Sequence, residues 1–401
     1  MKHLTLLAMI VGCSGAKDDD GTDTTDTDTT NPTTDTDDTD TPTGTPTTGQ
    51  GGDYTFVTYN AGLAVGFVPA ADMREPEIGP ALAGLDADVV CLQEVWLPSQ
   101  VDSIATATTS AFPHQHFPDA SQSSDAQCQP GELDSLITCM DDAGCSDLCI
   151  DQVDDCLFDN CGIPFIVLPK DCMRCAMANV GSSPNEIVGV CEDDPIEYAY
   201  GGSFGTGILS KHPITSTEEL VFESTSNRRS ALRAVLDTPD GEVAVYCTHL
   251  TAVFDTIPYP RDSGGWEEEQ AVQVAELIAW VDGDTTEHKV LMGDLNTGPG
   301  IGDINAEAPD NWAMLAAADF EIPYLDDSPE CTYCADNALL AGSADNDDNR
   351  IIDHVMLRGW SAFPATARVL DQTLPGTESC GESFEPGALS DHYGVSTTAS
   401  W

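Results

Sequence analysis

The chain has 401 residues, of which 14 are basic and 69 acidic, so its formal net charge is −55, while 41% of its residues are hydrophobic. That hydrophobic content suffices for a sizeable core and excludes a chain that is disordered throughout. The negative charge disfavours long-range attraction to polynucleotides and anionic lipids, and a polyanionic substrate would need a metal to offset it. A surface that keeps the protein soluble in salty surroundings is the simpler interpretation of the same charge.

Residues 1–13 have the pattern of an export signal, because a basic start precedes an apolar run and a small residue precedes Cys13. The run is too short for a permanent membrane-spanning helix. The letters "IVGC" resemble a bacterial lipobox, which would make Cys13 the lipidated first residue of a cell-envelope lipoprotein. The alternative is an ordinary secretory signal that is cut nearby. Both interpretations place the protein outside the cytoplasm.

Residues 14–52 consist mainly of Asp, Thr, Pro and Gly and contain almost no side chain that could enter a core. We expect a disordered, extended tether, which a lipid-anchored domain would need to stand off a membrane. A mucin-like stalk is the other compositional interpretation, but the threonines alternate with aspartates rather than with prolines.

From about Gly52 onward, short apolar runs alternate with amphipathic stretches, which predicts one mixed α/β domain over residues 53–401. The predicted strands are runs rich in β-branched residues at 54–62, 87–95, 205–214, 229–238, 241–250, 288–296 and 350–357. Residues 267–281 predict a helix with an acidic first turn that covers a sheet face with Val272, Ala275, Leu277, Ile278 and Val281.

Residues 121–200 interrupt this pattern with nine of the 15 cysteines, and we expect a cysteine-rich, mostly helical insertion stapled by disulfides. The spacing of Cys145 and Cys149 puts both thiols on one helical face. Cys91 and Cys247 lie inside apolar runs and are interpreted as buried free thiols. Complete pairing of the others then requires a bridge from the insert to the C-terminal region, which holds Cys331, Cys334 and Cys380. Zinc is the alternative for the two C-x-x-C spacings, but export favours disulfides.

Several predicted strands end in a polar residue that serves phosphate chemistry. These residues are Asn60, Glu94, His249, Asp294 with Asn296, Asp353, and Asp391 with His392. Strands that finish at one sheet edge bring their last residues into a common cleft, where carboxylates can hold a hard cation and imidazoles can move protons. His354 adjoins Asp353 but points the other way on a strand, so we interpret it as structural.

In chain order, "TYNAG", "VVCLQEVW", "GTGILSKHPI", "RSALRAVL", "YCTHL", "GDLNTGP", "IIDHVML" and "LSDHYGV" resemble the signature blocks of the endonuclease/exonuclease/phosphatase (DNase I-like) superfamily. The resemblance is strongest to its secreted neutral sphingomyelinase and phosphodiesterase branch, and it covers residues 53–401 apart from the insert. It implies a four-layer α/β sandwich, in which helices flank two packed β-sheets and the active site lies at one end of the sheets.

The resemblance also implies a role for each matching residue. Glu94 would be the principal ligand of a divalent metal, Mg²⁺ or alternatively Mn²⁺ or Ca²⁺, with Asn60 and Asp391 beside it. His392, oriented by Asp353, would be the general base or a phosphate-contacting group. Asp294 would position or deprotonate the attacking water, Asn296 would donate to a phosphate oxygen, and His249 would stabilise the phosphoryl group or help the leaving oxygen depart.

The choice of substrate depends on features outside these motifs. Lys and Arg are scarce, and the neighbouring Arg228, Arg229 and Arg233 match a structural strand block, so a polynucleotide would be held poorly. A zwitterionic choline phospholipid needs no basic cluster. Phe254, Ile257, Tyr259 and Trp266 could dip into a lipid interface, or pack under their own loop.

We therefore expect a secreted or lipid-anchored, metal-dependent phosphodiesterase that cleaves a phospholipid headgroup as a sphingomyelinase does. The alternatives are an extracellular nuclease of the DNase I type and a catalytically silent binding module that displays the insert. The seven intact residues of the motifs argue against the silent module, and the partner of the insert is left open.

Overall fold

The computed structural model describes residues 52–119, 126–179, 182–193, 203–225, 227–254, 259–326, 329–340, 348–384 and 387–401. The expected export signal with Cys13, and the expected tether up to residue 51, lie outside the described residues. Among the residues in these ranges, no helix is long and apolar enough to cross a membrane.

Two β-sheets form the centre of the fold. The first sheet has the strand order β10-β15-β1-β2-β4-β3, in which β1 runs parallel to β2 and antiparallel to β15. Its strands are β1 (Tyr54–Asn60), β2 (Val89–Gln93), β3 (His114–His116), β4 (Gly207–Ser210), β10 (Ala362–Val369) and β15 (Gly394–Ser400). The second sheet has the order β5-β6-β7-β8-β9, in which β7 runs parallel to β8. Its strands are β5 (Ile214–Val221), β6 (Ser230–Thr238), β7 (Gly241–His249), β8 (His288–Asp294) and β9 (Asp353–Arg358).

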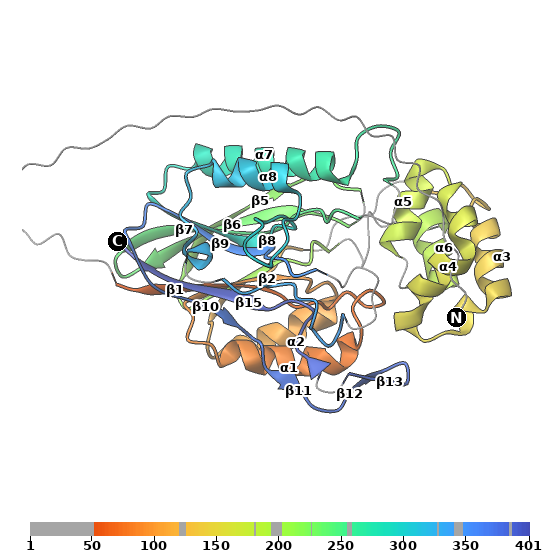
Figure 1. Ribbon diagram of the computed structural model, residues 1–401, viewed down its shortest axis with the longest axis horizontal. Helices are drawn as coiled ribbons and strands as arrows, with labels where there is room; N and C mark the ends of the chain where they lie inside the picture. Colours follow the sequence, from red (N-terminus) through yellow and green to blue (C-terminus); the bar gives the residue numbers. More distant parts are fainter. Residues whose placement is uncertain are drawn as a thin grey trace, which may run out of the picture. The chain divides into compact units, whose positions relative to one another are not determined.

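Helices cover the outer face of each sheet (Figure 1). The first sheet packs on α1 (Ala71–Ala83) and α2 (Pro98–Thr108), and the second packs on α7 (Trp266–Gly283) and α8 (Pro309–Ala316). A separate apolar core fills the space between the sheets, with Phe56 from the first sheet and Leu232, Val290 and Val355 from the second. The four-layer α/β sandwich is confirmed.

All seven predicted strands are present, and the sequence missed β3, β5, β10 and β15. Two of these, β5 and β10, are edge strands whose residues are mostly exposed or half-buried, so they lack the apolar alternation of a covered strand. Small two-stranded ribbons follow β10, formed by β11 (Thr373–Leu374) with β14 (Gly387–Ala388) and by β12 (Thr377–Ser379) with β13 (Glu382–Phe384).

The predicted helix at 267–281 is present as α7, but its buried face differs from the expected one. Val272 is 54% exposed and Ala275 is exposed, while Gln270 and Gln273 are fully buried. Their side-chain amides donate to the main chain of neighbouring loops, Gln270 to the Thr251 carbonyl (2.7 Å) and Gln273 to the Glu223 carbonyl (3.0 Å). A hydrophobic pattern misses such a face because its buried glutamines form hydrogen bonds with loop carbonyls and do not pack on apolar side chains.

The insert is helical, as expected, with α3 (Asp134–Ala143), α4 (Val153–Ile166), α5 (Lys170–Ala178), α6 (Pro184–Val188) and a π-helical turn at Gly189–Asp193. Disulfides join all fourteen cysteines of the described residues. The pairs within the insert are Cys128–Cys172, Cys139–Cys161, Cys145–Cys156 and Cys175–Cys191. Cys145 and Cys149 do not share a helix, since Cys145 begins a 3₁₀ turn. The expected bridge to the C-terminal region is confirmed as Cys149–Cys380, and Cys331 pairs with Cys334.

The prediction of free thiols at Cys91 and Cys247 is wrong. The two residues form a disulfide with their Cα atoms 5.3 Å apart. Cys91 lies on β2 of the first sheet and Cys247 on β7 of the second, and both point into the core between the sheets. The periodicity of each run places its cysteine on a buried face, but it cannot show that the two faces are opposed.

The aromatic loop after β7 packs against the insert rather than standing exposed to a lipid surface. Phe254 and Tyr259 meet the ring of Trp266 edge-on, with centroids 4.9 and 5.1 Å away. All three belong to the apolar cluster of the insert, and Trp266 is 5% exposed. Ile257 lies outside the described residues.

Candidate active site

The strand register brings the predicted site residues to one end of both sheets. Asn60 ends β1 beside the last residue of β2, which Glu94 follows. In the second sheet His249, Asp294 and Asp353 lie side by side at the ends of β7, β8 and β9. Asp391 and His392 precede β15, which pairs with β1.

Asn60 connects the acidic residues of the two sheets. Its Nδ2 donates to Oε1 of Glu94 (3.1 Å) and to Oδ2 of Asp294 (2.9 Å), while its Oδ1 accepts from the backbone N–H of Gly62 (2.9 Å). Because the amide oxygen is held by Gly62, the amide nitrogen must face the two carboxylates. Asn60 therefore fixes the separation of Glu94 and Asp294.

His392 and Asp353 form a buried pair in which Nδ1 of the ring lies 2.9 Å from Oδ2 of the carboxylate. Its Nε2 faces the interior of the site, 3.8 Å from Oδ2 of Asp294. Burial alone would lower the pKa of His392, but Asp353, Asp391 and Asp294 raise it well above its usual value. Burial raises the pKa of Asp353 to about 6, although His392 opposes that shift. The ring is therefore oriented by Asp353 and held in its charged form by the surrounding carboxylates.

His249 approaches Asp294 from the neighbouring strand, with Nε2 3.3 Å from Oδ2. Burial, and then the charge of Arg229, lower the pKa of His249 to about 4, so the ring is neutral at neutral pH. Among the described residues Nδ1 has no hydrogen-bond partner. Burial would raise the pKa of Asp294, but His249, His392 and Asn60 hold it below its usual value. Asp294 is therefore an ionised carboxylate between two imidazoles.

Glu94 and Asp391 form the other acidic part of the site. Burial, together with the charge of Asp391, raises the pKa of Glu94 to about 7. Its Oε2 is buried and accepts no hydrogen bond from the described residues. The segment of Asp391 approaches the backbone of Gly62 closely, since a Cβ there would lie 2.4 Å from Oδ1 of Asp391, and Gly62 has a φ of +56°. A buried carboxylate oxygen without a donor, next to a second carboxylate, is the chemistry of a site for a hard cation, so the residues present fit a divalent metal.

Asn296 and Glu94 both have left-handed backbones, with φ of +48° and +56°. Asn tolerates this conformation, but Glu rarely adopts it, and such strain persists where the surrounding structure enforces it. The backbone N–H of Asn296 donates to Oδ1 of Asp294 (2.9 Å), and its side-chain Nδ2 donates to the Leu250 carbonyl (2.9 Å). One side-chain N–H proton of Asn296 is thus left for a ligand.

Two buried arginines border the site and were not among the predicted site residues. Arg229, 5% exposed, precedes β6, and its Nη1 has no hydrogen-bond partner among the described residues. Burial lowers its pKa, while Glu94 and Asp294 oppose that shift. The two arginines near it in the sequence have other partners: Arg233 pairs with Glu218 and Asp284, and Arg228 stacks on Phe204.

Arg74 on α1 is fully buried, and its guanidinium donates only to main-chain carbonyls. The acceptors are Pro69 (2.9 Å), Ala61 (3.1 Å), Leu389 (2.9 Å) and Gly62. Two of them follow Asn60, and Leu389 lies two residues before Asp391. Arg74 therefore ties the two loops that carry these residues, and no motif of the sequence indicated it.

The structure thus brings together all eight predicted site residues, and it separates His354 from them. The ring of His354 stacks on Trp312, and its Nε2 contacts the Thr297 carbonyl (3.0 Å). Buried carboxylates, an ionised aspartate between two histidines and a buried arginine whose Nη1 has no hydrogen bond from the described residues are groups that can serve phosphoester hydrolysis.

The model of the endonuclease/exonuclease/phosphatase family matches residues 57–392, and the chain belongs to this family, which hydrolyses phosphoester bonds. A comparison of the sequence with curated proteins found no match.

Solved structures show the same fold at low sequence identity. SmcL aligns with a TM-score of 0.53 and 13% identity, covering 87% of this chain and 99% of that one. Sphingomyelinase C from Streptomyces griseocarneus aligns with a TM-score of 0.52 and 18% identity, with the same coverage. A mutant of beta toxin from Staphylococcus aureus with bound magnesium ions aligns with a TM-score of 0.53 and 14% identity, covering 86% and 99%.

Proposed function

We propose that the chain is a metal-dependent phosphodiesterase that cleaves the headgroup of a phospholipid, as a sphingomyelinase does. The observation that supports a metal is the buried Oε2 of Glu94, which accepts no hydrogen bond from the described residues. The charge of the nearby Asp391 acts on the same side chain. Glu94 and Asp391 would hold Mg²⁺, with Mn²⁺ or Ca²⁺ as alternative ions. Asn60, the third expected ligand, turns its amide nitrogen toward Glu94, so it would position that carboxylate instead of binding the ion. When bound, the metal would offset negative charge on the phosphoryl oxygens.

Asp294 is the proposed group that positions or deprotonates the attacking water. Its carboxylate is held ionised and is fixed by Asn60 and by the backbone of Asn296. A water hydrogen-bonded to it would face the phosphorus opposite the leaving oxygen, as an in-line displacement requires.

His392 and Arg229 are the proposed cations that contact the phosphate. The carboxylates around His392 keep its ring charged, and Asp353 directs Nε2 into the site. This favours phosphate contact over the general-base role of His392. Arg229 would supply its unpartnered Nη1, and Asn296 its remaining amide proton, to non-bridging oxygens. Neutral His249 has one ring N–H, which faces Asp294 and would help to hold that carboxylate. It would stabilise the phosphoryl group or the leaving oxygen on taking up a second proton at Nδ1.

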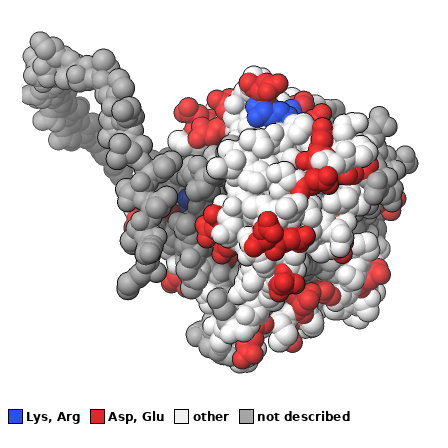
Figure 2. All heavy atoms as spheres, turned by 90° about the vertical axis from the view of Figure 1, so that its right-hand side faces the viewer, with Lys and Arg blue, Asp and Glu red and all other residues white. Residues whose placement is uncertain are grey.

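The surface charge supports a zwitterionic substrate over a polyanion. Figure 2 shows a face on which Asp and Glu side chains are spread widely, whereas Lys and Arg are few. A nucleic-acid backbone would be repelled along its length, but a single phosphodiester with a quaternary ammonium group would not. The similarity of the fold to two structures named as sphingomyelinase C and beta toxin supports the same choice.

The test is one substrate panel for the purified protein: sphingomyelin, phosphatidylcholine, plasmid DNA, RNA and a chromogenic phosphodiester, each with Mg²⁺ and with chelator. We expect phosphocholine release from sphingomyelin with Mg²⁺ and none with chelator. Plasmid nicking without lipid cleavage would replace this proposal by the extracellular nuclease, and no cleavage of any substrate would favour the silent binding module.

The site variants are Glu94→Ala and His392→Ala, each expected to lower turnover at least about 100-fold. His212→Ala is the matched control, because this histidine lies beside Asp88 at the opposite end of β2 from Glu94. Unchanged turnover in both site variants would exclude this mechanism. The lipid anchor at Cys13 and a binding partner for the insert stay predictions that this panel does not address.

A further inference from the structure

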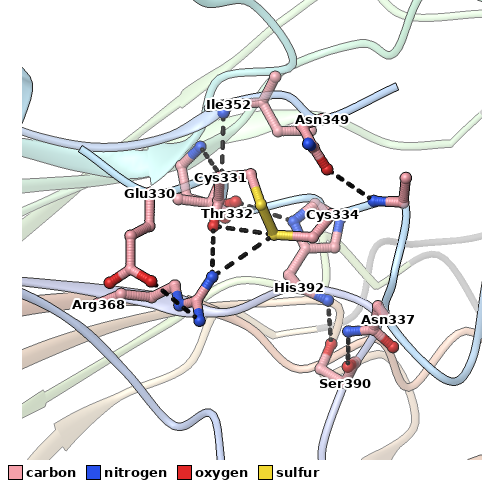
Figure 3. Close-up of a disulfide and its surroundings, with 12 residues drawn as sticks. Glu330, Cys331, Thr332, Cys334, Asn337, Asn349, Ile352, Arg368, Ser390 and His392 are labelled. Atoms are coloured by element: carbon pink, nitrogen blue, oxygen red, sulfur yellow. Dashed lines mark hydrogen bonds and ion pairs between the residues drawn. A yellow bond between two sulfur atoms is a disulfide. The ribbon is translucent and has the colours of Figure 1, made fainter. Parts of the chain in front are cut away.

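The segment 331–337, which we call the clamp segment, contains neither helix nor strand of its own, and it lies beside the loop of His392 and the start of β9 (Figure 3). The disulfide Cys331–Cys334 closes its first turn around Thr332. Thr332 and Cys334 are fully buried, and Asn337 is 1% exposed. None of these residues belongs to the proposed catalytic set.

The clamp segment holds the start of β9, from which Asp353 projects. Oγ1 of Thr332 accepts hydrogen bonds from the backbone N–H groups of Ile352 (3.1 Å) and Asp353 (3.2 Å). The backbone of Thr332 and Tyr333 pairs with Arg350 at 2.9 and 3.1 Å. One hydroxyl thus fixes the two consecutive N–H groups that lead into the Asp353 Cα.

The same segment also holds the loop of His392. The Thr332 carbonyl accepts from the N–H of Tyr393 (2.8 Å), and Nδ2 of Asn337 donates to the Ser390 carbonyl (2.9 Å). The ring of Tyr333 meets the His392 ring edge-on, with centroids 5.1 Å apart. Asp353 begins β9 of the second sheet, whereas His392 lies in the loop before β15 of the first. Thr332 is hydrogen-bonded to the main chain of Asp353 and to that of Tyr393, which follows His392.

The disulfide explains how a segment without regular structure can act as a rigid support. Main-chain bonds of Thr332 alone would leave its turn free to change conformation, and closing the turn removes that freedom. Arg368 adds a second restraint, since its Nη1 donates to the Cys331 carbonyl (3.4 Å) and its guanidinium lies over the Tyr393 ring (4.4 Å).

We propose that Thr332 is a positioning residue for the His392–Asp353 pair and that the Cys331–Cys334 bridge holds it in place. The inference rests on the proposed function for its kinetic effect. A displacement of His392 or Asp353 by even about 1 Å would lower turnover, because the phosphate contact requires both the Nδ1–Oδ2 bond and the direction of Nε2.

The kinetic test compares Thr332→Val, which keeps the shape but removes the hydroxyl, with Thr332→Ser, which keeps it. We expect Thr332→Val to lower kcat roughly ten- to a hundredfold and to leave KM within about twofold of the wild-type value. Thr332→Ser should keep most of the wild-type kcat. The Cys331→Ala/Cys334→Ala double variant should lower kcat in the same way. Asn349→Ala is the matched control, since it removes a hydrogen bond to the Ala335 N–H (3.1 Å) that touches neither member of the pair.

A second readout needs no activity. The Nδ1 proton shared by His392 and Asp353 should give a low-field proton NMR signal that is absent in His392→Ala. We expect the signal to persist in Thr332→Ser and Asn349→Ala, and to be lost or shifted in Thr332→Val and in the double variant. An unchanged signal and turnover in Thr332→Val, or an equal loss in Thr332→Ser, would overturn the inference. If the wild-type protein cleaves nothing in the panel, the proposed function fails, and the NMR comparison still decides the positioning role.

Discussion

Replacement of Arg74 by methionine should weaken both the fold and the metal site. The side chain is fully buried, and its guanidinium bonds four main-chain carbonyls, among them Ala61, Gly62 and Leu389. Each charged hydrogen bond contributes roughly 1.5–3 kcal/mol, but the values are not additive. Arg74→Met would leave four carbonyls without this donor. Because one unsatisfied buried acceptor costs about 1–3 kcal/mol, we expect the free energy of unfolding to fall by about 3–5 kcal/mol.

Calorimetry and magnesium titration measure the two consequences. The expected loss corresponds to a fall in Tm of roughly 4–7 °C for a chain of this size. Because the bonded carbonyls flank Asn60 and Asp391, affinity for Mg²⁺ should fall about 10- to 100-fold. Arg74→Lys keeps the charge but cannot reach four acceptors. Its Tm and its affinity for Mg²⁺ should therefore lie between those of Arg74→Met and of the wild type. Arg174→Met, at a half-buried arginine of the insert that pairs with Asp171, is the control. A loss below about 1 kcal/mol with unchanged Mg²⁺ affinity in Arg74→Met would refute the reasoning.

Removing the Cys91–Cys247 bridge by a double alanine substitution should cost about 2–4 kcal/mol in guanidinium denaturation, because it frees a closed loop of 156 residues; a cost near zero would contradict this. Arg229→Met should lower kcat/KM at least about tenfold yet leave Tm nearly unchanged, since burial of the guanidinium opposes folding while its attraction to Glu94 and Asp294 favours it; a large fall in Tm with full activity would assign Arg229 to the fold instead. Burial raises the pKa of Asp284, but its bonds to Arg233 and Tyr246 outweigh that and hold it below the usual value, so its contribution to stability is complete above about pH 4 and is lost as the pH falls. The free energy of unfolding should therefore drop less between pH 7 and pH 3 in Asp284→Asn than in wild type, and equal drops would exclude this contribution.

The site was predictable from the sequence because its residues stand at strand ends. A run such as "GDLNTGP" indicates both a strand and the polar residues that follow it, and parallel neighbours such as β7 and β8 must bring His249 and Asp294 together. The mixed α/β class followed from the alternation of apolar runs with amphipathic stretches, whereas the four-layer sandwich was implied by the resemblance of the motifs to the family.

The supporting residues were not predictable, because their partners are main-chain atoms far away in the sequence. Arg74 bonds Leu389 across 315 positions, and the acceptors are carbonyls that carry no sequence signal. The sequence gives no signal for the role of Thr332 either, since a threonine between two cysteines suggests a turn and not a contact with Ile352. The Cys91–Cys247 bridge depends on the packing of one sheet on the other, which the pattern of a single strand does not contain.

The position of β15 determines the stage of folding at which the candidate site can form. This strand is the last one described along the chain, yet it lies between β10 and β1 in the first sheet, with Ala399 opposite Tyr54. A chain synthesised only as far as β10 therefore has β1 without this neighbour, and it has neither Asp391 nor His392 next to Asn60. The candidate site is therefore completed only when β15 pairs with β1, so its assembly is coupled to completion of the first sheet.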